Sequence, residues 1–595
     1  MSPADGGGRA TGRPDGGGRG TGRPDGGGRG TGRPDGAGQG TGRPDGGRRT
    51  SGSGPRRQGP GRGADQGRPR TRRPRVDAPR LAAYEVLRQV AGSDAYANLV
   101  LPNLLRDRDI TGRDAGFATE LAYGTLRLQG RYDAVLSQCT NGRPLSALDP
   151  EVLDLLRLGA HQILGMRVPA HAAVSETVAL TRAVAGPAPS GLVNAVLRAV
   201  ARTDLAGWLK RIGDQADPDG TDQVARLAAT ASHPEWITRA LRQSLLADGR
   251  PADELGALLD ADNEPPRVTL VARPGLVDPK DLAEEIARES GHAPEPGRWS
   301  PFALVAAGGD PARLKSVRRA RAGVQDEGSQ LVALALAAAP LTSPDGGKRG
   351  PGPATDDADQ PRVSRLGETE PGESQPGESQ PGETEPGETR PGATPPDDRA
   401  WLDLCAGPGG KAALLGALAH ERGATLLANE LAPHRAGLVR GSVSAVPHGT
   451  VEVRVGDGRE LGEEMPGRFD RVLVDAPCTG LGALRRRPES RWRRTPADLT
   501  QLSALQRSLL ASAVEATRVG GVIAYVTCSP HLAETRTVVE DAVRRRGDVE
   551  LLDAAAVVRS IAVTEPPGLG DGPFVQLWPH AHGTDAMFLA LLRRT

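Results

Sequence analysis

The sequence predicts an α/β protein whose C-terminal domain is Rossmann-like and follows an all-α domain and a small α+β domain. Residues 76–205 space apolar side chains three and four apart, and residues 400–595 alternate short apolar strands with helices around a glycine-rich turn. Residues 1–75 and 341–399 are too rich in glycine, proline and charge to bury a core. We therefore expect two disordered segments, 1–75 and 341–399, and three domains, 76–205, 206–340 and 400–595.

The distribution of charge and cysteine excludes several classes of protein. The net charge of +1 hides a tail with 17 Arg and 6 Asp and an insert with 13 acidic and 6 basic residues. No run of 18 apolar residues and no apolar N-terminal leader is present, so we expect neither a membrane partner nor secretion. The 4 cysteines form no C-x-x-C pair, which predicts a reduced, cytoplasmic protein with no metal site.

The two low-complexity segments have more than one interpretation. The tail repeats TGRPDGGGRG, and it is either a non-specific RNA-binding arm or a solvated extension without a specific role. The insert repeats PGES and PGET units and is best interpreted as a tolerated surface-loop insertion.

Helical periodicity fills the first domain and recurs in the second. Segments such as LAAYEVLRQV and EVLDLLRLGAHQILG follow it within 76–205, where Cys139 is expected to be a buried structural cysteine. In the second domain, HPEWITRALRQSLL predicts a helix and PPRVTLVAR a strand, and SVRRARAGVQDEGSQLVALALA predicts a strand or turn followed by a helix.

The third domain opens with the stretch AWLDLCAGPGG at 400–410, followed by the helical composition of KAALLGALAH. A strand that ends in a glycine-rich turn and leads into a helix begins a Rossmann-like unit. Glycines at Gly407, Gly409 and Gly410 let the backbone approach a ligand closely. Nucleotide, flavin and methyl-donor sites all use such a turn, so further residues must identify the ligand.

Three carboxylates follow the next strands at the same edge of the predicted sheet. Glu430 ends LLANE, Asp457 follows VEVRV, and Asp475 ends FDRVLVD. Such a crevice suits the ribose and positive sulfonium of S-adenosyl-L-methionine better than a dinucleotide pyrophosphate, which prefers the absent G-x-G-x-x-G turn. The alternative for each acid alone is a turn-forming or helix-capping role.

Two cysteines stand directly after apolar strands at this edge, Cys478 in DAPC and Cys528 in VTCS. Cytosine C5 is a poor nucleophile, and a thiolate that adds at C6 activates it toward a methyl group. A second group must then help the C5 proton leave or release the product. A carboxyl group such as Asp475 can stabilise charge that develops at N3.

The quoted motifs resemble a known family. AYEVLRQV, FATELAYGTLR, LLRLGAHQIL, HAAVSETVAL and GLVNAVLRAV resemble the NusB-like RNA-binding domain. LDLCAGPGGKA, DAPCTGLGALRRRPESRW and TCSPHLAET resemble the Nol/Nop/Sun family of RNA cytosine-5 methyltransferases, in its bacterial Fmu/Sun (RsmB-like) type. That type acts on 16S ribosomal RNA, so the resemblance implies this RNA, or the immature small ribosomal subunit, as partner.

The resemblance also implies roles for single residues. Cys528 matches the family nucleophile and Cys478 the cysteine linked to product release, whereas the logic of DNA methyltransferases would make Cys478 attack. Asp475 would serve as base or stabilise charge. The residues that match the donor contacts are Cys405, Ala406, Gly407, Pro408, Gly409, Gly410, Lys411, Glu430, Asp457 and Asp475.

The arginine-rich stretch 483–494 follows Cys478 closely. Arg485, Arg486, Arg487 and Arg491 are candidates to hold phosphates that flank the target base. The alternative is a solvated basic loop whose Trp492 packs into the core. A thiol reaches C6 only of an unstacked base, so a single-stranded region is the expected target.

Three functions remain open at this point. The first is methylation of 16S ribosomal RNA, the second is the same chemistry on transfer RNA, and the third is a non-enzymatic RNA-binding or ribosome-assembly factor. The presence of both cysteines and the glycine-rich turn favours an enzyme. Nothing in the domain count requires a dimer, so a monomer is expected.

Overall fold

The structure, a computed structural model, describes residues 76–93, 95–342 and 398–595. The predictions for the tail and for most of the insert lie outside these residues. The first helix, α1 (Ala78–Gly92), begins where the Asp77 side chain accepts a hydrogen bond from the Arg80 amide at 3.1 Å. It opens a helical bundle that contains two apolar clusters and buries Cys139, as expected. The other helices of this region are α2 (Ala97–Asp107), α3 (Gly112–Arg127), α4 (Gln129–Cys139), α5 (Pro150–Leu164), α6 (Ala170–Val184), α7 (Ser190–Val200), α8 (Leu205–Ala216) and α9 (Gln223–Thr230).

The middle region combines helices with a small antiparallel sheet of strand order β2-β3-β1-β4. The predicted helix is α10 (Glu235–Ala247) and the predicted strand is β1 (Val268–Ala272). The last predicted pair is β4 (Ala322–Val324) and α14 (Glu327–Ala338). Its remaining elements are α11 (Glu254–Asn263), α12 (Pro279–Ser290), β2 (Glu295–Pro296), β3 (Ala303–Ala306) and α13 (Lys315–Arg318).

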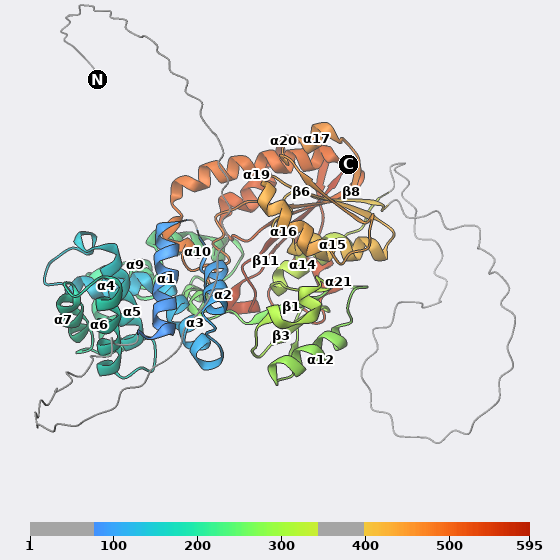
Figure 1. Cartoon of the computed structure of the whole chain (residues 1–595). Coiled ribbons are helices and arrows are strands. Elements are labelled where there is room, and N and C mark those ends of the chain that lie inside the picture. The colour runs from blue at the N-terminus through green and yellow to red at the C-terminus, as the bar shows by residue number, and fades with distance from the viewer. Residues whose placement is uncertain (1–75, 94, 343–397) are drawn as a thin grey trace, which may run out of the picture. The chain divides into compact units, whose positions relative to one another are not determined.

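The large sheet of the C-terminal region, drawn in yellow to red in Figure 1, contains the labelled strands β6, β8 and β11. Its strand order is β10-β12-β9-β8-β5-β6-β7, with β11 paired to β12. Five strands run parallel, and the strands beyond β9 are antiparallel. The Rossmann-like fold class is confirmed. The strands are β5 (Ala400–Asp403), β6 (Thr425–Glu430), β7 (Val451–Val455), β8 (Phe469–Asp475), β9 (Thr517–Thr527), β10 (Val549–Leu551), β11 (Phe574–Gln576) and β12 (Phe588–Arg594).

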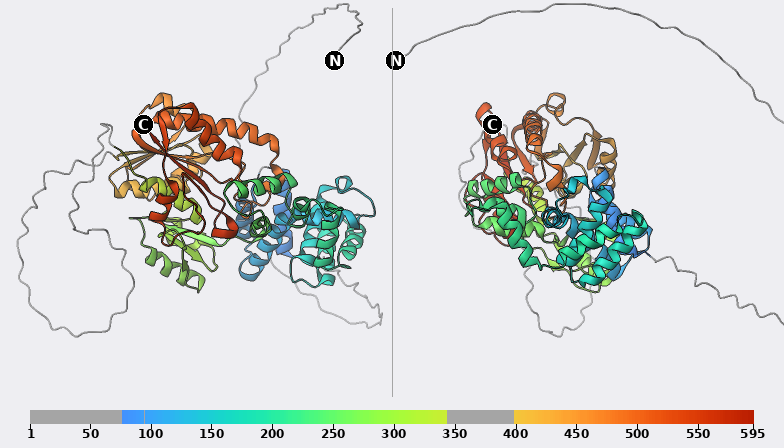
Figure 2. Two further views of the ribbon diagram at one scale, coloured as in Figure 1. Left: turned by 180° about the vertical axis from the view of Figure 1, so that it is seen from behind. Right: turned by 90° about the vertical axis from the view of Figure 1, so that its left-hand side faces the viewer.

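Helices cover both faces of this sheet (Figures 1 and 2). One apolar cluster joins it to α14, α15 (Gly410–Glu421), α16 (Pro433–Val443) and α21 (Ala554–Ile561). A second cluster joins the opposite face to other helices. Thus α14 packs on the large sheet although its residues precede the insert. The helices of the opposite face are α17 (Leu461–Glu464), α19 (Pro496–Ala516) and α20 (Arg536–Arg545), and two short helices, α18 (Ser490–Arg493) and α22 (Pro579–His582), lie in connecting segments.

The sheet order creates a topological switch point between β5 and β8. From β5 the chain proceeds outward to β6 and β7, and from β8 it proceeds outward in the other direction to β9. Ligands of open α/β sheets bind in the crevice outside the carboxyl ends of the strands at such a point. Asp403 ends β5 and Asp475 ends β8, so both flank this crevice.

Candidate active site

The glycine-rich turn lies tightly against its neighbours. Gly409 has φ +111°, and a Cβ atom there would stand 2.7 Å from the Ser442 Cβ atom. A Cβ atom at Gly407 would stand 2.1 Å from Oε2 of Glu430, to which the Gly407 amide donates a hydrogen bond at 3.0 Å. Only glycine fits at these two positions, because any side chain would collide with α16 or with Glu430.

The three predicted acids occupy the same edge of the sheet, each with its own partner. Glu430 is 3 % exposed and also pairs with Arg435, whose Nη1 atom lies 3.3 Å from Oε1. Asp457 follows β7 and pairs with Arg459. Asp475 accepts a hydrogen bond from Nζ of Lys411 at 2.9 Å.

The two predicted cysteines meet at the end of β8 and β9. The Cys478 and Cys528 sulfur atoms lie 3.4 Å apart, within hydrogen-bonding distance for thiols. Both side chains are only partly exposed. Because β8 pairs in parallel with β9, with Asp475 opposite Val526, the residues that follow the two strands emerge side by side. The register of β8 against β9 therefore places the two thiols side by side.

The pair is electrostatically unequal. The hydrogen bond from the Cys478 thiol lowers the pKa of Cys528 below its ordinary value, and Lys411 and Arg487 act in the same direction against burial and Asp475. The same hydrogen bond, together with burial, raises the pKa of Cys478 well above its ordinary value. Cys528 is therefore the more readily ionised thiol of the pair, and Cys478 is the one that holds its proton more firmly. Burial raises the pKa of Cys405 strongly, so that thiol stays neutral.

A buried carboxylate that the sequence analysis missed holds the two cysteine turns together. Glu534 is fully buried, and its carboxylate accepts hydrogen bonds from the Thr479 amide at 2.8 Å and from the Thr479 hydroxyl. It also accepts one from Nε2 of Gln506 at 3.2 Å. The Thr479 and Ser529 hydroxyl oxygens lie 3.1 Å apart, so the residues after each cysteine share one network.

Asp403 was also missed. It is 1 % exposed, and neither carboxylate oxygen has a hydrogen-bond partner among the described residues. A buried, unpartnered carboxylate beside a bare glycine turn and further acids fits a ligand that carries positive charge. The chain therefore offers a donor set that fits S-adenosylmethionine, with the backbone of Gly407–Gly410 for close approach and acids for hydroxyl and cationic groups.

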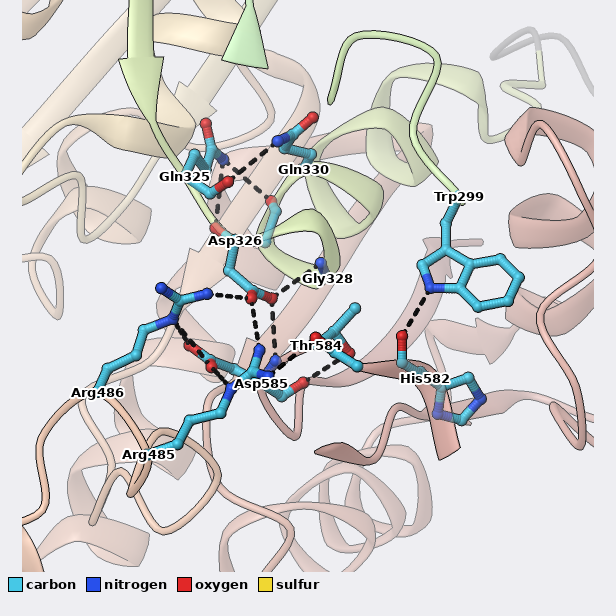
Figure 3. Close-up of polar contacts among 12 residues, drawn as sticks. Trp299, Gln325, Asp326, Gly328, Gln330, Arg485, Arg486, His582, Thr584 and Asp585 are labelled. Carbon is cyan, nitrogen blue, oxygen red and sulfur yellow. Dashed lines mark hydrogen bonds and ion pairs between the residues drawn. The ribbon is translucent and has the colours of Figure 1, made fainter. Parts of the chain in front are cut away.

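The structure corrects the expectation that three of the four arginines are free for RNA. Arg485 and Arg486 pair with Asp326, at the start of α14, and with Asp585, before β12 (Figure 3). Arg485 is 7 % exposed. These guanidinium groups contact protein, and so they hold segments distant in sequence together. Neither the RNA-contact nor the solvated-loop interpretation describes them.

Arg491 is fully buried where the loop after Cys478 meets the N-terminal helices. It donates hydrogen bonds to carbonyl oxygens of Arg127 and Asp262 at 2.9 and 2.7 Å. It also bonds the Ser232 carbonyl oxygen and Oδ1 of Asn263. Its expected RNA contact is therefore wrong in this structure. Trp492 is 37 % exposed, so it is not the core residue of the alternative interpretation.

Arg487 differs from its neighbours because it is exposed. Its guanidinium carbon lies 5.0 Å from the centroid of the Tyr96 ring, which belongs to the N-terminal helical region. It is also close enough to Cys528 to lower the pKa of that thiol. Among the four predicted arginines, this one combines exposure with proximity to the thiol pair.

The described residues contain neither a membrane-spanning helix nor a metal-binding cluster. No helix in the described ranges is long and apolar enough to cross a bilayer. Likewise, residues 76–93, 95–342 and 398–595 contain no group of three or more His, Cys, Asp or Glu side chains arranged to hold a metal ion.

Comparison with known proteins gives two family matches. The family described as 16S rRNA methyltransferase RsmB/F matches residues 393–593, and the NusB family matches residues 77–202. A protein of Mycobacterium tuberculosis named as a methyltransferase is 46 % identical over 529 residues, which cover 88 % of this chain and 99 % of the relative.

Further relatives carry a more specific name or a solved structure. Ribosomal RNA small subunit methyltransferase B of Pseudomonas putida is 30 % identical over 80 % of this chain and 91 % of its own length. A solved structure described as PH0851 superposes with a TM-score of 0.64 at 18 % identity, over 87 % of this chain and 99 % of that one. The last comparison supports the fold alone.

Proposed function

Since the chain belongs to the RsmB/F family of 16S rRNA methyltransferases, we propose that it methylates C5 of a cytosine in 16S ribosomal RNA with S-adenosyl-L-methionine as donor. The contact between the Cys478 and Cys528 sulfur atoms, 3.4 Å long, carries the proposal, because it makes one thiol nucleophilic at the expense of the other. The donor supplies an electrophilic methyl group when bound.

The Cys528 thiolate adds to C6 of the cytosine, which forms a sulfur–carbon bond and turns C5 into an enamine carbon. C5 then takes the methyl group. Loss of the C5 proton re-forms the C5–C6 double bond and expels the Cys528 thiolate. Every bond made to the enzyme is thus broken before the product leaves.

Cys478 suits the second half of this cycle. The negative charge on Cys528 and the hydrogen bond between the thiols help to raise the pKa of Cys478. Addition of Cys528 to C6 removes that charge, so Cys478 can then lose its own proton to water, and the Cys478 thiolate can accept the proton from C5. Cys478 therefore links adduct formation to product release.

Asp475 and Lys411 act as a pair beside the thiols. The hydrogen bond of 2.9 Å from Nζ of Lys411 fixes the Asp475 carboxylate at the end of β8. Addition of the thiolate at C6 places negative charge on N3 of the cytosine, and Asp475 can offset that charge only by donating a proton from its carboxyl form to N3. Lys411 also lowers the pKa of Cys528, so it favours the nucleophile directly.

The test uses the full-length protein, labelled S-adenosylmethionine and RNA that lacks the modification. We expect 5-methylcytosine in 16S ribosomal RNA, presented naked or in immature small subunits. Cys528→Ala should abolish transfer and keep donor binding, whereas Cys478→Ala should accumulate an RNA–protein adduct that survives denaturing electrophoresis. Cys139→Ala, in the helical bundle, is the matched control and should be fully active.

Other outcomes assign other functions. Label in transfer RNA would keep the mechanism and change the substrate. Donor binding without transfer to any RNA would favour a binding or assembly factor. Full activity of Cys528→Ala would refute the assignment of the nucleophile.

A further inference from the structure

Asp403 is a buried ionisable residue at the site to which the proposed mechanism gives no role. It ends β5, the central strand, and pairs in register with Ala428 of β6 and Leu473 of β8. Its side chain is 1 % exposed, neither oxygen makes a well-formed hydrogen bond among the described residues, and of the backbone amides only that of Cys405 is near enough to lower its pKa. Isolated ionised carboxylates are very costly to bury, so this group needs either a proton or a cation.

Among the described residues, the basic groups near Asp403 are already paired with other acids. Nζ of Lys411, on α15, donates to Asp475 of β8 at 2.9 Å. Arg435, on α16, is 3.3 Å from Glu430 of β6. Asp475 and Glu430 both add negative charge near Asp403, and Lys411 offsets only part of it.

Burial and the surrounding negative charge together determine the protonation state of Asp403 in the free protein. Burial is the main cause that raises its pKa, to about 8, with Asp475 and Glu430 adding to the effect. The carboxyl group therefore carries a proton at neutral pH. The adjacent Cys405 thiol is neutral as well, so it contributes no charge.

We propose that Asp403 is a proton-linked receptor for a cationic group of the methyl donor. The free protein holds a proton on the Asp403 carboxyl group, and arrival of the donor's cation breaks that O–H bond and releases the proton to the buffer. No covalent bond to the donor forms. The inference rests on the proposed function, since it requires S-adenosylmethionine as the ligand, but it does not depend on which RNA is methylated.

Proton release makes donor affinity depend on pH in a defined direction. Below the pKa of Asp403 the donor must displace a proton, so affinity should rise about tenfold between pH 6.0 and pH 7.0. The donor's own α-amino group stays protonated in this range, because such groups titrate at about 7.7–8.0. The protein group is thus separated from the ligand group by the choice of pH.

The experiment is calorimetric titration of the full-length protein with S-adenosylmethionine at pH 6.5, in two buffers of different ionisation enthalpy. We expect close to one proton released per donor bound, and the pH-dependence above. Asp403→Asn should bind without proton release and with affinity nearly independent of pH. The exposed Asp281→Asn on α12 is the matched control and should behave like the wild type.

Proton release and the pH-dependence of donor affinity are both measured on the wild-type protein. The test therefore does not depend on a core variant that might fail to fold. S-adenosylhomocysteine, which keeps the ammonium but has a neutral sulfur, releases the proton if the ammonium is the cation and does not if the sulfonium is. Donor binding with equal heats in both buffers and a flat pH profile would overturn the inference and leave the proposed function intact. Absence of any donor binding between pH 6 and pH 8 would overturn both.

Discussion

Replacement of Glu534 tests whether the two cysteine turns are held by one buried carboxylate. Its oxygens accept three hydrogen bonds, two from Thr479 and one from Gln506. Hydrogen bonds to a charged group contribute about 1.5–3 kcal/mol each and neutral ones about 0.5–1.5 kcal/mol. Glu534→Gln, which keeps the shape and removes the charge, should therefore cost about 1 kcal/mol per bond, or about 3 kcal/mol in total.

Glu534→Ala should cost more. It leaves the Thr479 amide buried without an acceptor, whereas Gln506 keeps its bond to the Pro477 carbonyl oxygen and the Thr479 hydroxyl keeps Ser529. A buried donor left without an acceptor typically costs about 1–3 kcal/mol, in addition to the hydrogen bonds that are lost. If about 1.4–3 kcal/mol of this lost stabilisation also raises the activation free energy of methyl transfer, kcat should fall about ten- to a hundredfold.

The assays separate a positioning role from a merely structural one. Denaturant unfolding measures the stability loss, and single-turnover methyl transfer measures the chemical step. The pH profile of Cys528 alkylation should shift upward, because loosened turns weaken the bond from Cys478 that lowers the Cys528 pKa. Donor affinity should stay constant. Glu540→Ala, an exposed glutamate on α20, is the matched control.

One result would refute this reasoning. If Glu534→Ala matched the Glu540→Ala control in unfolding midpoint, alkylation profile and kcat, the buried network would have no role in placing the thiols. A loss of stability with an unchanged alkylation profile would restrict Glu534 to folding.

Three further predictions follow from other contacts. Gly409→Ala should abolish donor binding and cost at least about 1–3 kcal/mol of stability, because the new Cβ atom at φ +111° would collide with Ser442. Calorimetry measures donor binding and denaturant unfolding measures stability. Gly437→Ala is the control, because its Cβ atom would meet nothing within 4 Å. Burial raises the pKa of Asp262 to about 7, so the stability contributed by its protonated carboxyl group is complete below about pH 4 and is lost as pH rises through 7. Asp262→Asn should therefore raise the free energy of unfolding more at pH 8 than at pH 5. An equal change at both pH values would contradict this prediction. Arg487→Ala should reduce the slope of RNA affinity against salt by about one without changing stability, whereas Arg485→Ala should cost about 3–5 kcal/mol of stability.

The positions of site residues at the ends of strands could be predicted from the sequence, because each depends only on the few residues before it. Glu430, Asp475 and Cys528 each stand directly after, or at the end of, an apolar strand, and parallel strands bring their carboxyl ends to one edge. The predicted strand and helix pairs of the middle region follow equally local periodicity. The side-by-side placement of Cys478 and Cys528 is a direct consequence of the same rule.

Partners distant in sequence were not readable. Nothing beside Arg485 in the chain indicates Asp326, which lies 159 residues away, so the basic stretch resembled a surface loop. Glu534 is part of the recognised TCSPHLAET motif, yet its role depends on Thr479, 55 residues earlier. Asp403 offered one signal, an acid at the end of the first strand before the glycine turn, which is where the other site acids stand on their own strands.

The burial of Arg491 ties the loop after Cys478 to several regions of the chain. Its guanidinium group bonds the ends of α3 and α11, and the nearby Arg493 bonds carbonyl oxygens around residues 90–95. A Rossmann-like fragment produced alone would expose these two arginines without the carbonyl oxygens that accept their hydrogen bonds. Such a fragment is a poor reagent for inhibitor screening. The N-terminal helices are better regarded as a tethered subunit of the enzyme, and two-piece reconstitution as the assembly of a heterodimer.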